Sequence, residues 1–152
     1  MSIALPATAL AVNFENDFMV EVLPVARILI AEDDSVSRII CYKIVEKLGH
    51  TPLLSPDGKH AYQTLVSNNK IDLLITDVMM PEMDGRALIK TLRGHSTLAG
   101  LPVIIMSAVV GVEDIADLLK LGADLFLPKP VDKNDVEDYI ERCLGMDRSY
   151  TG

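Results

Sequence analysis

The chain has little positive charge and no long apolar run, and each shortage excludes a class of protein. Its 14 Lys and Arg residues stand against 22 Asp and Glu residues, which gives a formal net charge of −8. Because phosphate contacts need clustered Lys and Arg, this balance disfavours direct binding of nucleic acid or of an anionic membrane surface. No run reaches the roughly 20 apolar residues of a membrane span. Residues 1–26 contain no Lys or Arg, so they lack the positive start of a secretory signal. We expect a cytoplasmic location.

Cysteine and histidine are also scarce. The two cysteines, Cys41 and Cys143, lack metal-ligand spacing and fall in segments predicted to be helical. We expect them to be free core thiols in a reducing cytosol. The three histidines, His50, His60 and His95, are scattered without ligand spacing, and we expect them to be exposed to solvent.

From Arg27 onward, short apolar runs alternate with longer amphipathic segments. The apolar runs are the predicted strands: residues 27–34, 51–55, 71–77, 101–108 and 123–129. The amphipathic segments are the predicted helices: residues 35–50, 57–68, 84–94, 113–122 and 131–145. Five such strand–helix units predict a doubly wound α/β fold, in which a five-stranded parallel sheet is covered by helices on both faces.

The alternation predicts one domain over residues 27–145, preceded by an extension, 1–26, and followed by a tail, 146–152. Four apolar residues of the extension would share one side of a helix ended by Pro24: Phe14, Phe18, Met19 and Val22. A loose arm fits the same residues equally well. We expect the extension to be a packing or dimer-contact element, or to be disordered, so a homodimer stays an open alternative.

The stretch LLITDVMMPEMDG, residues 73–85, runs an apolar strand into a single acid, Asp77, and then turns at once. Glu32 and Asp33 end the first predicted strand in the same way. Functional groups of an open parallel sheet gather beyond the carboxyl ends of its strands, so we expect these three carboxylates to share a cleft. Crowded carboxylates raise one another's pKa unless a cation shares the site. We therefore predict a Mg²⁺ site formed by the three acids and the backbone carbonyl of Met79.

Two other strand ends carry complementary groups, the hydroxyl of Ser107 and the ammonium of Lys129. Both suit an incoming phosphoryl group, whose oxygens need donors and a neutralising charge. Asp77 is the central carboxylate and is therefore the predicted nucleophile, which would form an aspartyl phosphate. Pro81 is expected to stiffen the following turn, and Gly85 to permit a backbone conformation that a larger residue would resist.

Together these residues resemble the receiver domain of bacterial two-component response regulators, the chemotaxis-regulator-like group, over residues 27 to about 144. The correspondence rests on Glu32 with Asp33, on Asp77 in TDVMMPEMDG, on Ser107 in MSA and on Lys129 in LPKP. The resemblance implies a flavodoxin-like sheet of strand order 2-1-3-4-5 with five flanking helices. It implies Mg²⁺ as cofactor and a phosphoryl group passed to Asp77 from a sensor histidine kinase or a histidine phosphotransfer protein. Such a protein is a switch that catalyses its own phosphorylation and slow dephosphorylation, not an enzyme acting on a separate substrate.

The resemblance also assigns a switch. Ser107 would move towards the phosphate and Phe126 would fill the space it leaves. The face formed by the fourth predicted helix, the fifth strand and the fifth helix would then repack and contact a downstream protein. In the family, side chains two residues beyond the phosphoacceptor and two beyond the switch hydroxyl position attacking water. Here both are apolar, Met79 and Val109, which predicts slow loss of the phosphoryl group.

Some residues depart from the commonest family pattern. Glu32 stands where Asp is commoner, Ser107 where Thr is frequent, and Phe126 where Tyr is usual. Two alternatives stay open: a receiver-like binding module that is not regulated by phosphorylation, and a metal-dependent phosphohydrolase that turns over through an aspartyl phosphate. Haloacid-dehalogenase-like enzymes use Asp-x-Asp for the latter, whereas Met79 takes the place of the second acid here. The sequence ends shortly after the predicted domain, so we expect a stand-alone regulator or a fragment of a longer protein.

Overall fold

The computed structural model describes residues 10–13, 19–22, 25–68, 70–108 and 111–145. Five parallel strands form one sheet in the order β4-β3-β5-β6-β7. Their bounds are β3 Arg27–Ala31, β4 Thr51–Ser55, β5 Leu73–Asp77, β6 Val103–Ser107 and β7 Leu125–Pro128. Counted within the domain, this is the order 2-1-3-4-5, so the predicted doubly wound fold is confirmed.

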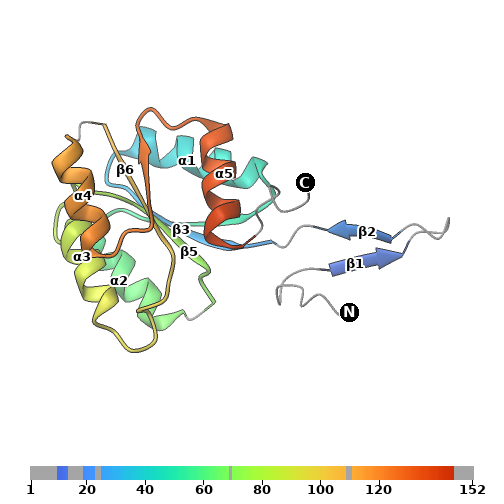
Figure 1. Ribbon diagram of the computed structural model, residues 1–152, viewed down its shortest axis with the longest axis horizontal. Helices are drawn as coiled ribbons and strands as arrows, with labels where there is room; N and C mark the ends of the chain where they lie inside the picture. The colour runs from blue at the N-terminus through green and yellow to red at the C-terminus, as the bar shows by residue number, and fades with distance from the viewer. Residues whose placement is uncertain (1–9, 14–18, 23–24, 69, 109–110, 146–152) are drawn as a thin grey trace.

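Five helices follow the five strands of this sheet. They are α1 Ser35–Lys47, α2 Gly58–Ser67, α3 Gly85–Arg93, α4 Val112–Leu121 and α5 Lys133–Cys143. Helices α1 and α5 lie on one face of the sheet, and α2 and α3 lie on the other (Figure 1). Four of the helices begin at an aspartate whose side chain accepts a hydrogen bond from a backbone N–H in the first turn: Asp34, Asp57, Asp84 and Asp132.

The sheet is buried on both faces. All residues of β5 and β6 are buried, as expected for central parallel strands. Because successive side chains of a strand point to opposite faces, Leu29 packs in the cluster beneath α2, α3 and α4, whereas Ile30 packs in the cluster beneath α1 and α5. Polar groups that belong to the sheet are therefore confined to the ends of its strands.

The N-terminal extension forms a hairpin. Strands β1 (Leu10–Asn13) and β2 (Met19–Val22) pair with each other in antiparallel register and make a two-stranded sheet of their own. Figure 1 shows this hairpin beyond the end of the domain at which β3 begins. The helix alternative is wrong for Met19 and Val22, because an isolated short helix is marginal in water whereas two short segments can bond to each other. Phe14, Phe18 and Pro24 lie outside the described residues.

Both cysteines are free, Cys41 buried and Cys143 half-buried, as predicted. The histidines are less exposed than expected. His50 and His95 are half-buried, and the His50 Nδ1 accepts a hydrogen bond of 3.0 Å from the Ala26 N–H. His60 is exposed but lies 2.8 Å from the hydroxyl of buried Ser55. Within the described ranges, no helix is both long enough and apolar enough to cross a membrane.

Candidate functional site

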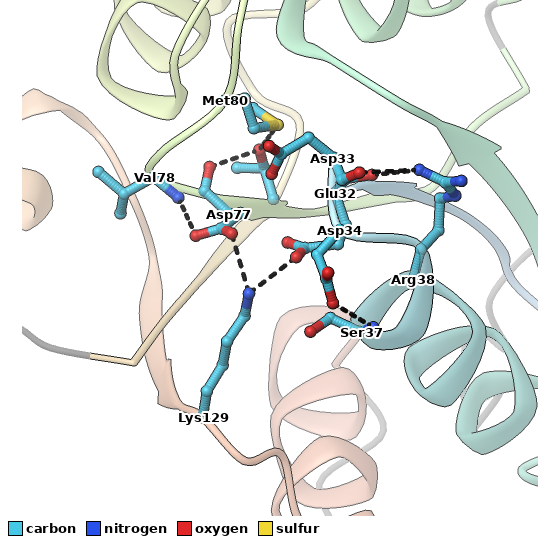
Figure 2. A network of polar contacts seen from close by, with 10 residues as sticks. Glu32, Asp33, Asp34, Ser37, Arg38, Asp77, Val78, Met80 and Lys129 are labelled. Atoms are coloured by element: carbon cyan, nitrogen blue, oxygen red, sulfur yellow. Dashed lines mark hydrogen bonds and ion pairs between the residues drawn. The ribbon is translucent and has the colours of Figure 1, made fainter.

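The register of the sheet brings the predicted acids together. Ala31 of β3 lies opposite Thr76 of β5, so Glu32 emerges beside Asp77. Carboxylate oxygens of Glu32, Asp33 and Asp77 lie within 4.8 Å of one another, at the edge shown in Figure 2. Asp33 is exposed, whereas Glu32 and Asp77 are buried. The three side chains therefore line one small acidic site that opens to solvent on the side of Asp33.

Lys129 reaches this site from the far side of β6. It follows the last residue of β7, and its Nζ donates hydrogen bonds of 2.9 Å to Glu32 Oε1 and to Asp77 Oδ2 (Figure 2). The backbone N–H of Lys129 also donates to the carbonyl of Ser107, at 2.9 Å. One ammonium group thus bonds to two carboxylates at the ends of different strands. The backbone of Lys129 is hydrogen-bonded to a third strand, β6.

Both carboxylate oxygens of Asp77 are held in place. Oδ1 accepts a hydrogen bond of 2.7 Å from the N–H of Val78, and Oδ2 accepts the bond from Lys129. The hydroxyl of Thr76 donates to the Asp77 carbonyl at 3.0 Å. The side chain of the predicted nucleophile is therefore oriented by a backbone group and a cation together.

The turn after Asp77 needs a glycine for lack of space. A Cβ on Gly85 would overlap the carbonyl oxygen of Asp77 and would lie 2.9 Å from the Cα of Val78. Gly85 is also the first residue of α3, and its N–H donates to the Val78 carbonyl at 2.8 Å. A larger residue is therefore resisted at Gly85, as predicted, and the cause is this close approach rather than a positive φ, which Gly85 does not have. In this turn the positive φ falls on Glu82, at 66°.

Glu32 is the most deeply placed acid of the site, with no exposed surface. Burial raises the pKa of Glu32 to about 7, and the neighbouring Asp77 adds to the rise, while Lys129 opposes it. For Lys129, burial alone would lower the pKa, but Asp77 and Glu32 together raise it above its ordinary value. Burial of Glu32 therefore favours its neutral form unless a second cation shares the site.

The residues present fit a hard divalent cation. Oε2 of Glu32 is buried and has no hydrogen-bond partner among the described residues, so it is an oxygen available for a ligand. Three carboxylates against one ammonium leave an excess of negative charge when all are ionised. Oxygen donors of this kind are those that Mg²⁺ prefers. Met79 is 75% exposed. Its backbone carbonyl stays a predicted ligand of the cation.

The predicted switch residues lie beside the acids rather than among them. Ser107 is the last residue of β6 and is 8% exposed. Among the described residues, its hydroxyl makes no hydrogen bond to the acidic site. Phe126 lies opposite Ile105 and packs, half-buried, against the cluster beneath α3 and α4. Val109 lies outside the described residues.

Several contacts of the site were not predicted from the sequence. Arg38 of α1 donates from Nη1 to the carbonyls of Glu32, at 2.9 Å, and of Asp33, at 3.4 Å. The N–H of Glu32 donates to the carbonyl of Ser55 at 3.0 Å. Such contacts leave no periodic pattern in a sequence. The one signal for Arg38 was its place one turn beyond Asp34, where a helical side chain can reach back to the preceding loop.

A family model, the response regulator receiver domain, matches residues 28–141. The chain belongs to this family. The predicted identity is thereby confirmed, and membership in this family supports a role in phosphoacceptor signalling. Receiver domains bind Mg²⁺ in the active site and interact with histidine kinases, phosphotransfer proteins and downstream targets. They are generally phosphoacceptor switches rather than conventional enzymes.

Relatives of this receiver domain are proteins of very different length. It is 39% identical over 103 residues to a gliding motility regulatory protein of Myxococcus xanthus, covering 68% of this chain but 13% of that protein. It is 30% identical over 120 residues to a chemotaxis protein CheY homolog of Campylobacter jejuni, covering 78% of this chain and 92% of that protein. The chain therefore spans a small part of one relative and nearly all of the other.

A solved structure gives the same picture of the fold. The signal receiver domain of a signal transduction histidine kinase from Syntrophus aciditrophicus superimposes with a TM-score of 0.73 at 32% identity. The match covers 82% of this chain and 93% of that structure. Receiver domains of this architecture thus occur both in short proteins and inside larger ones.

Proposed function

We propose that this chain is a phosphorylation-activated switch in which Asp77 accepts a phosphoryl group from the phosphohistidine of a sensor histidine kinase or of a phosphotransfer protein. The observation that carries the proposal is the position of the Lys129 ammonium, 2.9 Å from Asp77 Oδ2 and from Glu32 Oε1 inside an acidic site. A carboxylate beside a fixed cation is a suitable phosphoacceptor, because the incoming phosphoryl oxygens carry negative charge.

Glu32, Asp33, Asp77 and the Met79 carbonyl would hold Mg²⁺. When bound, this ion would neutralise charge on the phosphoryl oxygens. A carboxylate oxygen of Asp77 forms the new bond to phosphorus while the phosphorus–nitrogen bond of the donor histidine breaks. The leaving imidazole nitrogen keeps the electron pair of that bond and takes up a proton. Positioning and electrostatic stabilisation account for most of the rate enhancement of such a reaction. The Val78 N–H and the Lys129 ammonium position Asp77, and Lys129 also supplies positive charge.

A protein phosphodonor is supported by an exposed apolar stripe on α1. Val36, Ile39 and Ile40 are 64%, 50% and 47% exposed, and their spacing places them on one side of the helix. The stripe begins in the first turn of α1, close to Asp33. An apolar surface beside the phosphoacceptor suits a protein partner better than a small phosphoester.

The switch would begin at Lys129 and Ser107. A phosphoryl group on Asp77 would offer new oxygens to the Lys129 ammonium and to the Ser107 hydroxyl, and Phe126 would move into the space that Ser107 leaves. Phe126 packs against the same cluster that contains Leu118 of α4. A shift of the Phe126 ring would therefore change the packing of that helix. We propose that the face formed by α4, β7 and α5 then repacks and contacts the downstream protein. The free thiols of Cys41 and Cys143 suit a reducing cytoplasm as the site of this signalling.

The experiment is incubation with acetyl phosphate and Mg²⁺, followed by the intact mass of three proteins. Wild type should gain the mass of one phosphoryl group, and Asp77→Asn should gain none. Asp117→Asn is the matched control, because Asp117 is an exposed acid on α4, and it should behave as wild type.

Two outcomes would contradict the proposal. Wild-type protein that gains no mass would favour the binding module that is not phosphorylated. Continuous release of phosphate from many small phosphoesters would favour the phosphohydrolase.

A further inference from the structure

Arg38 lies beside the acidic site, yet its guanidinium donates to backbone carbonyls and not to a carboxylate. We propose that Arg38 is a positioning residue for the cation: it holds the backbone of Glu32 and Asp33 so that their carboxylates face the site, and it thereby sets the affinity for divalent metal. This inference rests on the proposed function, in which these two acids are metal ligands.

The segment between β3 and α1 has few other supports. Glu32 and Asp33 come after the last residue of β3 and before Asp34, which caps α1. The N–H of Glu32 is bonded to Ser55. The carbonyls of Glu32 and Asp33 both accept from the same atom, Arg38 Nη1, as Figure 2 shows. Arg38 is therefore the one described side chain that holds the carbonyl side of this segment.

The two acids need this support because they are placed very differently. Glu32 has no exposed surface, whereas the following residue, Asp33, is exposed, and still their oxygens come within 4.8 Å of each other and of Asp77. Adjacent residues in an extended chain point in opposite directions. Convergence of their carboxylates therefore depends on the backbone course between them, which is the part that Arg38 contacts.

Arg38 also acts on this segment without occupying a ligand atom. Lys129 bonds to carboxylate oxygens directly, so it shares the atoms that a metal ion would use. The guanidinium of Arg38 is attached to carbonyls that carry no formal charge, and it leaves the carboxylates free. Removal of a residue that orients metal ligands without binding the metal itself typically lowers metal affinity by about 10–100-fold.

Arg93 provides a matched comparison within the same chain. Its guanidinium donates to the carbonyls of Ala99, Leu101 and Gly122. Arg93 is the last residue of α3, at the opposite end of that helix from Gly85 and the acidic site. Loss of Arg93 should lower the stability of the fold, but it should leave the course of residues 32–33 unchanged.

The experiment measures binding of Mn²⁺ alone, by electron paramagnetic resonance of the free ion, to the unphosphorylated protein of residues 1–152. The variants are Arg38→Gln, Arg38→Lys and Arg93→Gln, and circular dichroism melts report their folding. Arg38→Gln should raise the Kd for Mn²⁺ by about tenfold. Arg38→Lys keeps the charge but not the planar guanidinium that places one nitrogen against both carbonyls, so it should give an intermediate Kd. Arg93→Gln should melt earlier than wild type and bind Mn²⁺ as wild type does.

An unchanged Kd in Arg38→Gln would overturn the inference. So would an equal loss of affinity in Arg93→Gln, because the effect would then follow general destabilisation, and so would a wild-type protein that binds no Mn²⁺. If Arg38→Gln cannot be purified in a folded form, Arg38→Lys tests the inference instead. A Kd for Mn²⁺ equal to that of wild type would then contradict it. Binding is measured without phosphorylation, so a wild type that binds Mn²⁺ but gains no phosphoryl group would contradict the proposed function and leave the role of Arg38 intact.

Discussion

The carboxylates of Glu32 and Asp77 share a single ammonium, and this arrangement explains several properties of the site. A glutamate at position 32 is one methylene longer than the aspartate commonest there. In this structure one of its carboxylate oxygens bonds to Lys129, and the other has no hydrogen-bond partner in the described part of the chain. Two buried acids cannot both be neutralised by one lysine. Their excess charge is the physical reason for expecting a divalent cation, and burial makes that need stronger than it would be at the surface.

The lifetime of the phosphorylated state should be controlled by Met79 and Val109. Both side chains are apolar, so neither can orient an attacking water, and Met79 is exposed. The variant Met79→Asn with Val109→Glu should lose its phosphoryl group at least several-fold faster than wild type. A time course of phosphate release from purified phosphoprotein measures this rate. A double variant as slow as wild type would show that these two positions do not control hydrolysis.

His50 should make stability depend on pH. Burial lowers the pKa of His50, Asp72 opposes the shift, and the imidazole Nδ1 accepts a hydrogen bond from the Ala26 N–H. Arg27 lies beside this group, and its N–H bonds to Asp72. Because the folded pKa is below the unfolded value of 6.5, the unfolded chain binds more protons in this range. Stability due to His50 is therefore present above pH 6.5 and is lost as the pH falls below it.

The expected loss on acidification is about 1 kcal/mol, the net value of a hydrogen bond that protonated Nδ1 cannot accept. Urea unfolding at pH 7.5 and at pH 5.5 measures it, with the two solution pH values chosen about one unit above and below the ordinary histidine pKa. His50→Asn is the control, because its side-chain oxygen can accept from Ala26 but does not titrate. Equal drops in wild type and variant would assign the pH dependence to other groups.

At the scale of elements, the turn between β5 and α3 is enclosed by the starts of two helices. Gly85 begins α3 against the backbone of Asp77 and Val78, and Gly58 begins α2, where a Cβ would overlap the carbonyl oxygen of Met83. Each glycine follows an aspartate that caps its helix. The pair of Asp-Gly steps therefore does two things, because the aspartate begins the helix and the glycine lets the backbone of the turn approach it closely.

Replacement of Gly85 by alanine should separate β5 from α3. The new Cβ would overlap the Asp77 carbonyl, which belongs to backbone that cannot move aside without shifting the phosphoacceptor. We expect Gly85→Ala to lower the free energy of unfolding by about 1–3 kcal/mol and to weaken Mn²⁺ binding. Gly100→Ala is the matched control, because a Cβ there meets nothing within 4 Å. Urea unfolding and the same Mn²⁺ titration would contradict this account if both variants behaved as wild type.

At the scale of the whole molecule, a sheet covered on both faces leaves one edge for chemistry and its periphery for partners. The acidic site occupies the carboxyl ends of β3 and β5, and Lys129 crosses to it from β7. The hairpin β1–β2 pairs with no strand of the five-stranded sheet. An isolated two-stranded hairpin is marginally stable in water, so the domain cannot depend on it for its core.

Removal of residues 1–24 should therefore leave a folded receiver domain. The shortened protein should unfold in urea close to the midpoint of the full chain and should gain a phosphoryl group from acetyl phosphate as the full chain does. A much lower midpoint would show that the extension stabilises the domain. Size-exclusion chromatography with light scattering on both proteins tests the homodimer, because a dimer lost on truncation would assign the contact to the extension.

Local patterns in the sequence determined the strands and helices of the sheet domain and the position of its acids. Alternation of apolar runs with amphipathic segments predicted each strand and helix of the sheet domain. Acids placed directly after two apolar runs predicted the site, because parallel strands end at the same edge. These features depend on neighbouring residues and on the period of side chains along an element, which a single chain displays directly.

Other features were decided by the tertiary structure. The bond from Lys129 to both Glu32 and Asp77, the clamp of Arg38 on two carbonyls and the need for glycine at position 85 all join atoms whose separation depends on strand register and helix placement. The hairpin of the extension was missed because a short apolar segment suits a helix or a strand, and only pairing between residues 10–13 and 19–22 decides which forms. Contacts of this kind have no local pattern, since they are set by which backbone atoms the completed fold brings within hydrogen-bonding distance.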